Sequence, residues 1–183
     1  MKSDQYQKQI VDRLLLMFNQ ESVRSEWDSV QYDGHTGNHK MIYAPRIDIA
    51  VGPFNSHTDI DLGVDSTKVM HSHIFTKRLV ESSLKYRGSL DKIWNGVSRC
   101  YLAIEIEFNG SSKHLFGSII NASVSGSIGI VIVNQDKLKK AERICNYIFR
   151  LEDLDRLELN GLKNLIIFER DDFLNFLSKI KKI

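Results

Sequence analysis

The segment from Ile128 to Val133, which reads IGIVIV, is apolar at every position except for one glycine. A strand with this pattern needs apolar cover on both faces, as strands in the parallel sheets of α/β proteins have. Residues 164–168 predict a second buried strand, and segments with helical spacing follow the two strands at 136–151 and 171–181. This alternation predicts an α/β fold with a partly parallel sheet flanked by helices.

The first half of the chain adds helices, strands and an insertion to this plan. Residues 3–20 predict an opening amphipathic helix, because apolar side chains recur there at helical spacing. Residues 41–54 and 101–108 predict strands, and residues 112–124 predict a helix rich in small residues. Residues 55–98 give mixed signals and form an insertion between the two strands. The 183 residues are expected to make a single domain.

The composition narrows the class of protein without identifying a partner. Hydrophobic residues make up 42% and charged residues 26%, which is the ordinary mix of a globular domain. A net charge of +2 is compatible with almost any ligand, nucleic acid included. The first residues are polar and no apolar run has the length of a membrane span. A cytoplasmic location without a membrane partner is therefore expected.

Asp48 lies in the middle of the first apolar strand. Ile47, Ile49 and Val51 alternate along this strand, which predicts that they share a core-facing side and that Asp48 points to the other. A carboxylate inside an apolar strand needs a partner, because an isolated buried charge is very unfavourable. Arg46 and a metal ion are the candidate partners, and this segment alone favours the ion pair with Arg46.

A pair of carboxylates on the later strand changes that balance. Residues 101–108 read YLAIEIEF, so alternation places Ala103, Glu105 and Glu107 on one face. Two carboxylates at this spacing lie about 7 Å apart and repel each other. A divalent cation would relieve the repulsion, since Mg²⁺ is commonly held by one or two carboxylates, waters and phosphate oxygens. Asp48, Glu105 and Glu107 are therefore the candidate metal ligands.

The order of these residues and elements resembles the PD-(D/E)xK nuclease superfamily, which includes restriction endonucleases. Residues 3–133 contain, in sequence, a helix, strands, a Glu-x-Glu strand, a small-residue helix and a buried strand. Asp48 matches the motif aspartate, and Glu105 matches the first acid of the second half-motif. Glu107 stands where the superfamily usually has lysine, although some of its restriction endonucleases carry glutamate there instead. Pro45 precedes the aspartate by three residues, whereas the motif has the two adjacent.

The resemblance implies a restriction-endonuclease-like mixed central sheet flanked by helices, with a C-terminal helix-strand-helix extension. It also implies a Mg²⁺- or Mn²⁺-dependent deoxyribonuclease that hydrolyses the phosphodiester bonds of DNA. In that enzyme Asp48 and Glu105 hold the ion, and Glu107 is the third ligand or the base that positions water.

Further candidates surround this set. Lys113 is a candidate for the positive charge missing at position 107, because it stands near a helix N-terminus, where the helix dipole disfavours a lysine. A solvated surface lysine is an equally good interpretation. Glu21 is a candidate additional acid, although a surface glutamate is the simpler interpretation. His114, Ser118 and Asn121 are candidates for contact with a nucleic-acid backbone, or they satisfy neighbouring main chain.

Other polar groups receive simpler interpretations. The histidines and aspartates between residues 57 and 73 lack the spacing of a structural zinc site, so they are interpreted as polar loop side chains. Basic residues gather at 77–78, 85–87, 137–140 and 179–182, and each group is interpreted as the solvated face of a helix. The groups between 77 and 87 also lie where DNA contacts are expected.

Two other functions stay open. The first is a nucleic-acid-binding module or subunit without catalytic activity, which is expected if glutamate in place of lysine at position 107 abolishes catalysis. A protein-interaction domain is expected if the acidic face is simply exposed to water. A homodimer is compatible with the sequence. The sequence does not determine which DNA sequence or structure is preferred, or the biological pathway.

Overall fold

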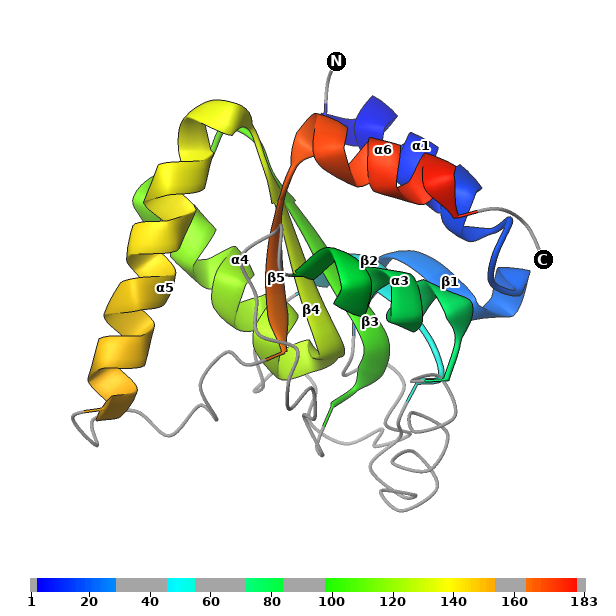
Figure 1. Ribbon diagram of the computed structural model, residues 1–183, viewed down its shortest axis with the longest axis horizontal. Coiled ribbons are helices and arrows are strands. Elements are labelled where there is room, and N and C mark those ends of the chain that lie inside the picture. Colours follow the sequence, from blue (N-terminus) through cyan, green and yellow to red (C-terminus); the bar gives the residue numbers. More distant parts are fainter. Residues whose placement is uncertain (1–2, 29–45, 55–71, 84–97, 154–163, 181–183) are drawn as a thin grey trace.

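The computed structural model describes residues 3–28, 46–54, 72–83, 98–153 and 164–180. Within these ranges the chain forms a mixed five-stranded sheet flanked by helices (Figure 1), which confirms the predicted α/β class. The elements in chain order are α1 (Ser3–Leu14), η1 (Gln20–Ser22), β1 (Val23–Asp28), β2 (Arg46–Val51), α3 (Ile74–Ser83), β3 (Cys100–Glu107), α4 (Ser112–Ser125), β4 (Gly126–Val133), η3 (Gln135–Lys137), α5 (Leu138–Asp153), β5 (Leu165–Glu169) and α6 (Arg170–Lys179).

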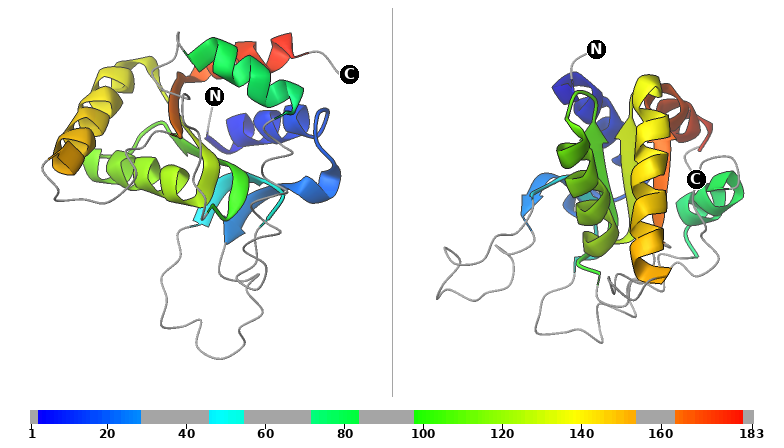
Figure 2. Two further views of the ribbon diagram at one scale, coloured as in Figure 1. Left: turned by 60° about the horizontal axis from the view of Figure 1, so that its bottom comes forward. Right: turned by 90° about the vertical axis from the view of Figure 1, so that its left-hand side faces the viewer.

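The sheet changes from antiparallel to parallel at its central strand. The strand order is β1-β2-β3-β4-β5, with antiparallel pairing among the first three strands and parallel pairing among the last three. Parallel neighbours need a long crossover connection, and α4 and α5 provide the two crossovers. Figure 2 shows both of these helices on the same side of the sheet. The strand that carries Glu105 and Glu107 is therefore the central one.

Helices cover both faces of the sheet and enclose two apolar clusters. The helices α1, α3 and α6 pack on one face, where the core includes the rings of Tyr6, Phe75 and Phe173. The helices α4 and α5 cover the other face, where the core is mainly aliphatic and includes Leu115 and Ile148. Figure 1 shows the first layer to the right of the sheet and the second to its left.

The apolar segment 128–133, which predicts a strand with apolar cover on both faces, lies in β4, and this strand is buried along its whole length. The strand begins at Gly126, two residues before the predicted start. Gly129 allows α4 to lie close against it, since a Cβ atom there would come within 2.7 Å of the Ala122 carbonyl oxygen. The prediction of a buried strand is confirmed, and the close approach of the helix explains the single glycine in the run.

The opening helix is shorter than the apolar spacing predicts. It ends at Leu14 and not near Gln20, and the chain then turns, yet Phe18 still reaches the core. The Tyr6 hydroxyl donates a hydrogen bond of 2.5 Å to the Arg170 carbonyl oxygen, which connects α1 to α6. The first and last helices of the chain thus form part of one layer.

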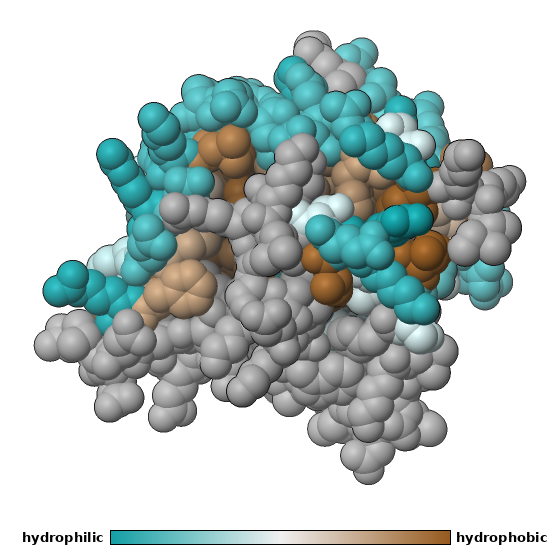
Figure 3. All heavy atoms as spheres, in the orientation of Figure 1, coloured by the Kyte–Doolittle hydropathy of each residue, from teal (hydrophilic) through white to brown (hydrophobic). Residues whose placement is uncertain are grey.

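The outer surfaces of the helices are mostly polar. In the view of Figure 3, hydrophilic side chains cover most of the coloured surface, and apolar side chains appear between them in separate patches. Tyr147 and Phe149 on α5 are among the larger exposed apolar side chains. Within the described segments, none of the helices combines the length and the apolar character that a bilayer crossing requires.

Two glycines, Gly117 within α4 and Gly129 on the strand against it, are expected to respond oppositely to alanine. Gly129→Ala should lower the free energy of unfolding by about 1–3 kcal/mol, because the new Cβ meets the α4 main chain. Gly117→Ala should raise it by about 0.5–1 kcal/mol, since a Cβ at this helical position has no other atom within 4 Å. Urea unfolding of both variants measures the difference, and equal effects would contradict the packing of α4 on β4.

Candidate functional site

Asp48 lies opposite Glu105 at the point where β2 and β3 separate. The paired ladder joins Ile49 to Ile104, and the same register places Asp48 opposite Glu105. Main-chain pairing ends at Ile49, and beyond it the Oδ2 atom of Asp48 accepts a hydrogen bond of 2.7 Å from the main-chain N–H of Ile106. The Asp48 side chain thus takes the place of a main-chain carbonyl as the acceptor for Ile106, and its carboxylate bridges β2 to β3.

Glu105 is buried next to α4 with one oxygen atom unsatisfied. Its exposed fraction is 6%, and the side chain of Asn121 on α4 forms a hydrogen bond with its carboxylate. The other carboxylate oxygen, Oε1, is buried without a hydrogen-bond partner within the described part of the chain. A buried carboxylate oxygen in this state is unfavourable, so the group is expected to take up a proton or a cation.

The electrostatic environment of the two facing carboxylates disfavours their charged forms. Burial, and next the charge of Asp48, raises the pKa of Glu105 to about 9, although the hydrogen bond from Asn121 acts in the opposite direction. Burial raises the pKa of Asp48 to about 6, against the lowering effect of its main-chain hydrogen bond. The charges of Glu26 and Glu107 raise both pKa values further. Negative charge is therefore crowded here, which favours a bound cation.

Glu107 lies on the same strand, but one of its oxygens is engaged by the turn that follows. Its Oε1 atom accepts a hydrogen bond of 2.5 Å from the main-chain N–H of Gly110. A Cβ at Gly110 would lie 2.2 Å from that oxygen, so a larger residue there would displace the carboxylate from this position. The Lys137 ammonium donates in turn to the Gly110 carbonyl oxygen at 2.5 Å. Lys137 was interpreted as part of a solvated helix face, and this contact corrects that interpretation.

The expected set of three metal ligands is therefore only partly assembled. In the segments that the structure describes, no group of three or more histidine, cysteine, aspartate or glutamate side chains has the arrangement of a metal site. Glu107 is close enough to influence both pKa values, but its hydrogen bond directs one oxygen toward the turn.

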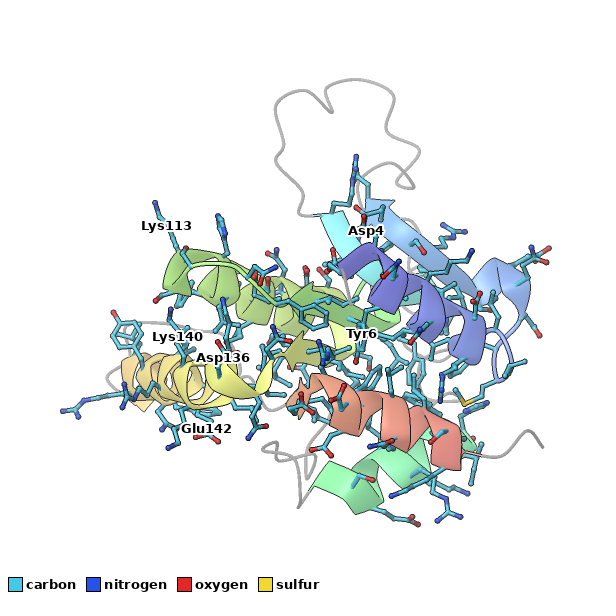
Figure 4. All side chains as sticks on the ribbon, turned by 90° about the horizontal axis from the view of Figure 1, so that it is seen from above. Asp4, Tyr6, Lys113, Asp136, Lys140 and Glu142 are labelled. Carbon is cyan, nitrogen blue, oxygen red and sulfur yellow. The ribbon has the colours of Figure 1, made fainter. Side chains whose placement is uncertain are left out.

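The candidates on α4 differ in their positions. Ser111 caps the helix by accepting a hydrogen bond of 3.4 Å from the His114 N–H, and the His114 side chain is exposed. Lys113 is exposed and points outward from the first turn of the helix (Figure 4). Ser118 is half-buried. Asn121, two turns into the helix, contacts the carboxylate pair through Glu105.

Other candidates lie away from this pair or outside the described residues. Glu21 is exposed in η1, in agreement with the simpler of its two interpretations. The ring of His73 stacks on Phe18 at 4.8 Å, and its Nδ1 atom accepts a hydrogen bond from the Phe75 N–H. It therefore has a packing and capping role. Pro45, the acidic and histidine residues at 57–71, and the basic residues at 85–87 lie outside the described residues.

The expected alternation along β2 is wrong at one position. Ile49 and Val51 pack in the cluster beneath α1, as predicted, whereas Ile47 packs with Trp27 in a separate cluster. The change occurs at Asp48, whose neighbour on β1 is Glu26, by the register of the flanking pairs. Glu26 has a positive φ of 49°, so β1 is distorted beside Asp48 and the facing of the side chains changes there.

Glu26 and Gln7 are site residues that sequence reasoning missed. The Gln7 amide on α1 donates to the Asp48 carbonyl oxygen at 2.8 Å and to the Glu26 carboxylate at 3.1 Å. Residues 21–39 are polar and contain glycine, so β1 has no clear periodic signal. Gln7 is one of several polar residues on an amphipathic helix, so the sequence does not mark it as a contact of Asp48.

The buried carboxylates are expected to make stability depend on pH. The folded protein keeps protons on Asp48 and Glu105 at pH values where the unfolded chain has lost them, so the free energy of unfolding should fall as pH rises from about 4 to about 9. Each group contributes at most about 1.4 kcal/mol per pH unit. Urea unfolding across this range measures the slope.

The variant Glu105→Gln should reduce this slope and raise stability at the alkaline end, because a neutral amide replaces the group that must ionise. Glu81→Gln, at an exposed position of α3, is the matched control and should retain the wild-type slope. A slope in Glu105→Gln equal to that of the wild type would contradict the burial of this carboxylate.

Comparison of the chain with protein-family models, with curated proteins and with solved structures found no match. The facing carboxylates and the order of elements are therefore the grounds on which a function is inferred. The relation to the PD-(D/E)xK superfamily stays a prediction from the residues.

Proposed function

We propose that this protein is a metal-dependent deoxyribonuclease that hydrolyses phosphodiester bonds in DNA. The observation that carries the proposal is the pair of facing carboxylates, Asp48 and Glu105, on adjacent strands. One oxygen of Glu105 is buried without a partner in the described residues, and the pKa values of both groups are raised. Perturbed carboxyl groups of this kind are typical of functional sites, because burying them without a ligand is unfavourable.

The donor set fits a hard divalent cation. Mg²⁺ and Mn²⁺ prefer oxygen ligands, and a Mg²⁺ ion commonly uses one or two carboxylates while retaining several waters. Asp48 and Glu105 would hold the ion, and Glu107 would act from the next position on the strand as a further acidic group.

The chain's own groups orient these carboxylates before any ligand binds. The Ile106 N–H fixes one oxygen of Asp48, and Asn121 fixes one oxygen of Glu105. Each carboxylate therefore keeps an oxygen for other partners. A bound Mg²⁺ or Mn²⁺ would supply an activated water and stabilise negative charge on the scissile phosphate. In the proposed enzyme Lys113 contributes positive charge at the helix N-terminus, toward the phosphate backbone.

The element order supports this proposal over a general metal-binding role. From α1 to β4 the chain contains a helix, three antiparallel strands, a crossover helix and a parallel strand, with η1 before β1 and the helix α3 between β2 and β3. Apart from η1 and α3, this is the order on which the resemblance to the nuclease superfamily rests. The two acids lie on the second and third of these strands, as the resemblance implies. The restriction-endonuclease-like fold remains part of the proposal.

The alternative is a nucleic-acid-binding module without catalytic activity. The observation that favours it is the position of Glu107, which occupies the lysine position and binds the Gly110 main chain. In this alternative the protein binds DNA in the absence of any metal, and the carboxylate pair keeps a proton in place of a cation.

Replacing either acid by its amide should abolish cleavage. Asp48→Asn and Glu105→Gln keep the shape and the accepting oxygen, so the Ile106 and Asn121 contacts can persist while the negative charge is lost. Cleavage of plasmid and branched DNA in Mn²⁺ should fall by at least about 100-fold in each variant, the scale seen when one transition-state contact is removed.

The control for this experiment is Glu81→Gln, which removes an exposed carboxylate on α3 and should cleave at the wild-type rate. Wild-type cleavage by either site variant would exclude the assignment. Duplex binding by a wild-type protein that neither cleaves DNA nor binds Mn²⁺ would favour the inactive module.

A further inference from the structure

The side of α5 that faces away from the sheet carries basic side chains and one aromatic ring. Ala141, Cys145 and Ile148 are buried on the inner side of this helix, in the core cluster that includes β4 and β5 residues. Helical spacing places a different set of residues on the opposite side. This set, the α5 outer face, consists of five exposed residues: Lys139, Arg143, Asn146, Tyr147 and Arg150.

The cations of the α5 outer face lack acidic partners. On other elements, Arg46 and Arg78 lie 3.9 and 2.9 Å from a carboxylate oxygen. In contrast, Lys139, Arg143 and Arg150 form no ion pair within the part of the chain that the structure describes. Lys139 and Arg143 are four residues apart, a spacing at which like charges destabilise a helix. An anionic partner would remove this repulsion.

Acidic and basic side chains are separated across α5. Glu142 is the only acid between residues 139 and 150, and Figure 4 shows it on the edge of the helix opposite Lys140. Lys140 lies on the edge nearer α4, and Lys113 of α4 lies on the same side of the molecule (left in Figure 4). The first turn of α5 contains no acid, although the helix dipole favours one there. Positive charge is thus concentrated on the α5 outer face and continues toward α4.

Tyr147 lies in the middle of the α5 outer face. Its side chain is 57% exposed and makes no ring contact with another described residue. Arg143 and Arg150 are each one helical turn away from it. Surfaces that bind single-stranded nucleic acid combine these two features: cations follow the phosphates, and an aromatic ring stacks on a base of any identity.

A lipid surface fits α5 less well than a nucleic acid does. A helix that lies on a membrane buries its apolar face in the lipid, whereas the apolar face of α5 is already used in the core. Phe149 is exposed too, but it is two residues from Tyr147 and therefore points to a different side of the helix. An acidic protein segment would neutralise the cations without using the ring of Tyr147.

We propose that the α5 outer face binds a single strand of DNA, with Lys139, Arg143 and Arg150 contacting phosphates and Tyr147 stacking on an unpaired base. The choice of DNA among nucleic acids rests on the proposed function, and it specifies the substrate class as DNA with single-stranded or branched regions. The helix rises by about 16 Å from Lys139 to Arg150, a length along which a strand presents several phosphates.

The experiment measures binding of a fluorescent single-stranded oligothymidylate to the full-length protein in EDTA, at several salt concentrations. The double variant Arg143→Gln and Arg150→Gln keeps good helix formers at both positions. It should reduce the slope of log K against log salt concentration by about 1.4, since each phosphate contact of a single strand contributes about 0.7. Tyr147→Ala should weaken binding by about 10-fold, and Tyr147→Phe, which keeps the ring, should bind as the wild type does.

The matched control is the double variant Lys8→Gln and Lys179→Gln. It removes the same charge from exposed positions on α1 and α6, which cover the other face of the sheet, and it should keep the wild-type slope. The competing explanation is that the α5 outer face is merely a solvated helix surface. An equal loss of binding in the control and in the α5 double variant would support that explanation and overturn the inference.

Two further probes test the other classes of partner. Polyglutamate represents an acidic protein segment, and phosphatidylserine vesicles represent a lipid surface. Tighter binding of either probe than of the oligonucleotide would overturn the inference, whereas weaker binding of both would support it.

The outcomes distinguish this inference from the proposed function. Wild-type binding by the α5 double variant and by Tyr147→Ala would overturn the role of α5, while loss of cleavage in Asp48→Asn would still support the nuclease. Weaker binding by both α5 variants, with no cleavage by the wild type in Mn²⁺, would support the α5 outer face and overturn the catalytic proposal. A wild-type protein that binds no DNA would overturn both.

Discussion

The burial of the Glu105 carboxylate beside Asp48 is the constraint to which the rest of this site responds. Two acids on adjacent strands cannot both carry an uncompensated charge inside a protein, because the loss of hydration and their repulsion add. The described structure stabilises each with one hydrogen bond, from Asn121 and from the Ile106 N–H. One oxygen of Glu105 stays unsatisfied, and this oxygen gives the site its demand for a proton or a cation.

The sheet makes this arrangement possible because its central strand has different neighbours on its two edges. Toward β4, the parallel ladder continues through Glu105 to Glu107, so β3 is paired along its length on this edge. Toward β2, the antiparallel ladder ends at Ile104, and the next main-chain donor is taken by the Asp48 side chain. Main-chain pairing between β2 and β3 therefore stops at the level of Asp48 and Glu105, where β3 is still paired with β4.

The sequence could predict those features of the site that depend on the alternation of side chains along a strand. Alternation along YLAIEIEF correctly places Glu105 on the face opposite Ile104, and Asp48 stands out as a charge in an apolar strand. The contacts of Glu26 and Glu107 could not be predicted from strand alternation. Glu26 lies on a strand with no periodic pattern and approaches Asp48 only through sheet register. Glu107 is turned by a hydrogen bond to a glycine three residues later, which is a matter of local turn geometry.

The amino-acid sequence by itself determined the α/β class, the buried β4 strand and the identity of the two central acids. These features follow from hydrophobic period and from the high cost of burying an unpaired charge, which are local properties of a segment. Only the tertiary structure decided which acids lie on neighbouring strands, because strand register brings Asp48 opposite Glu105 across a long sequence separation. It also decided where the side chains depart from regular alternation, since no sequence pattern marks the positive φ at Glu26.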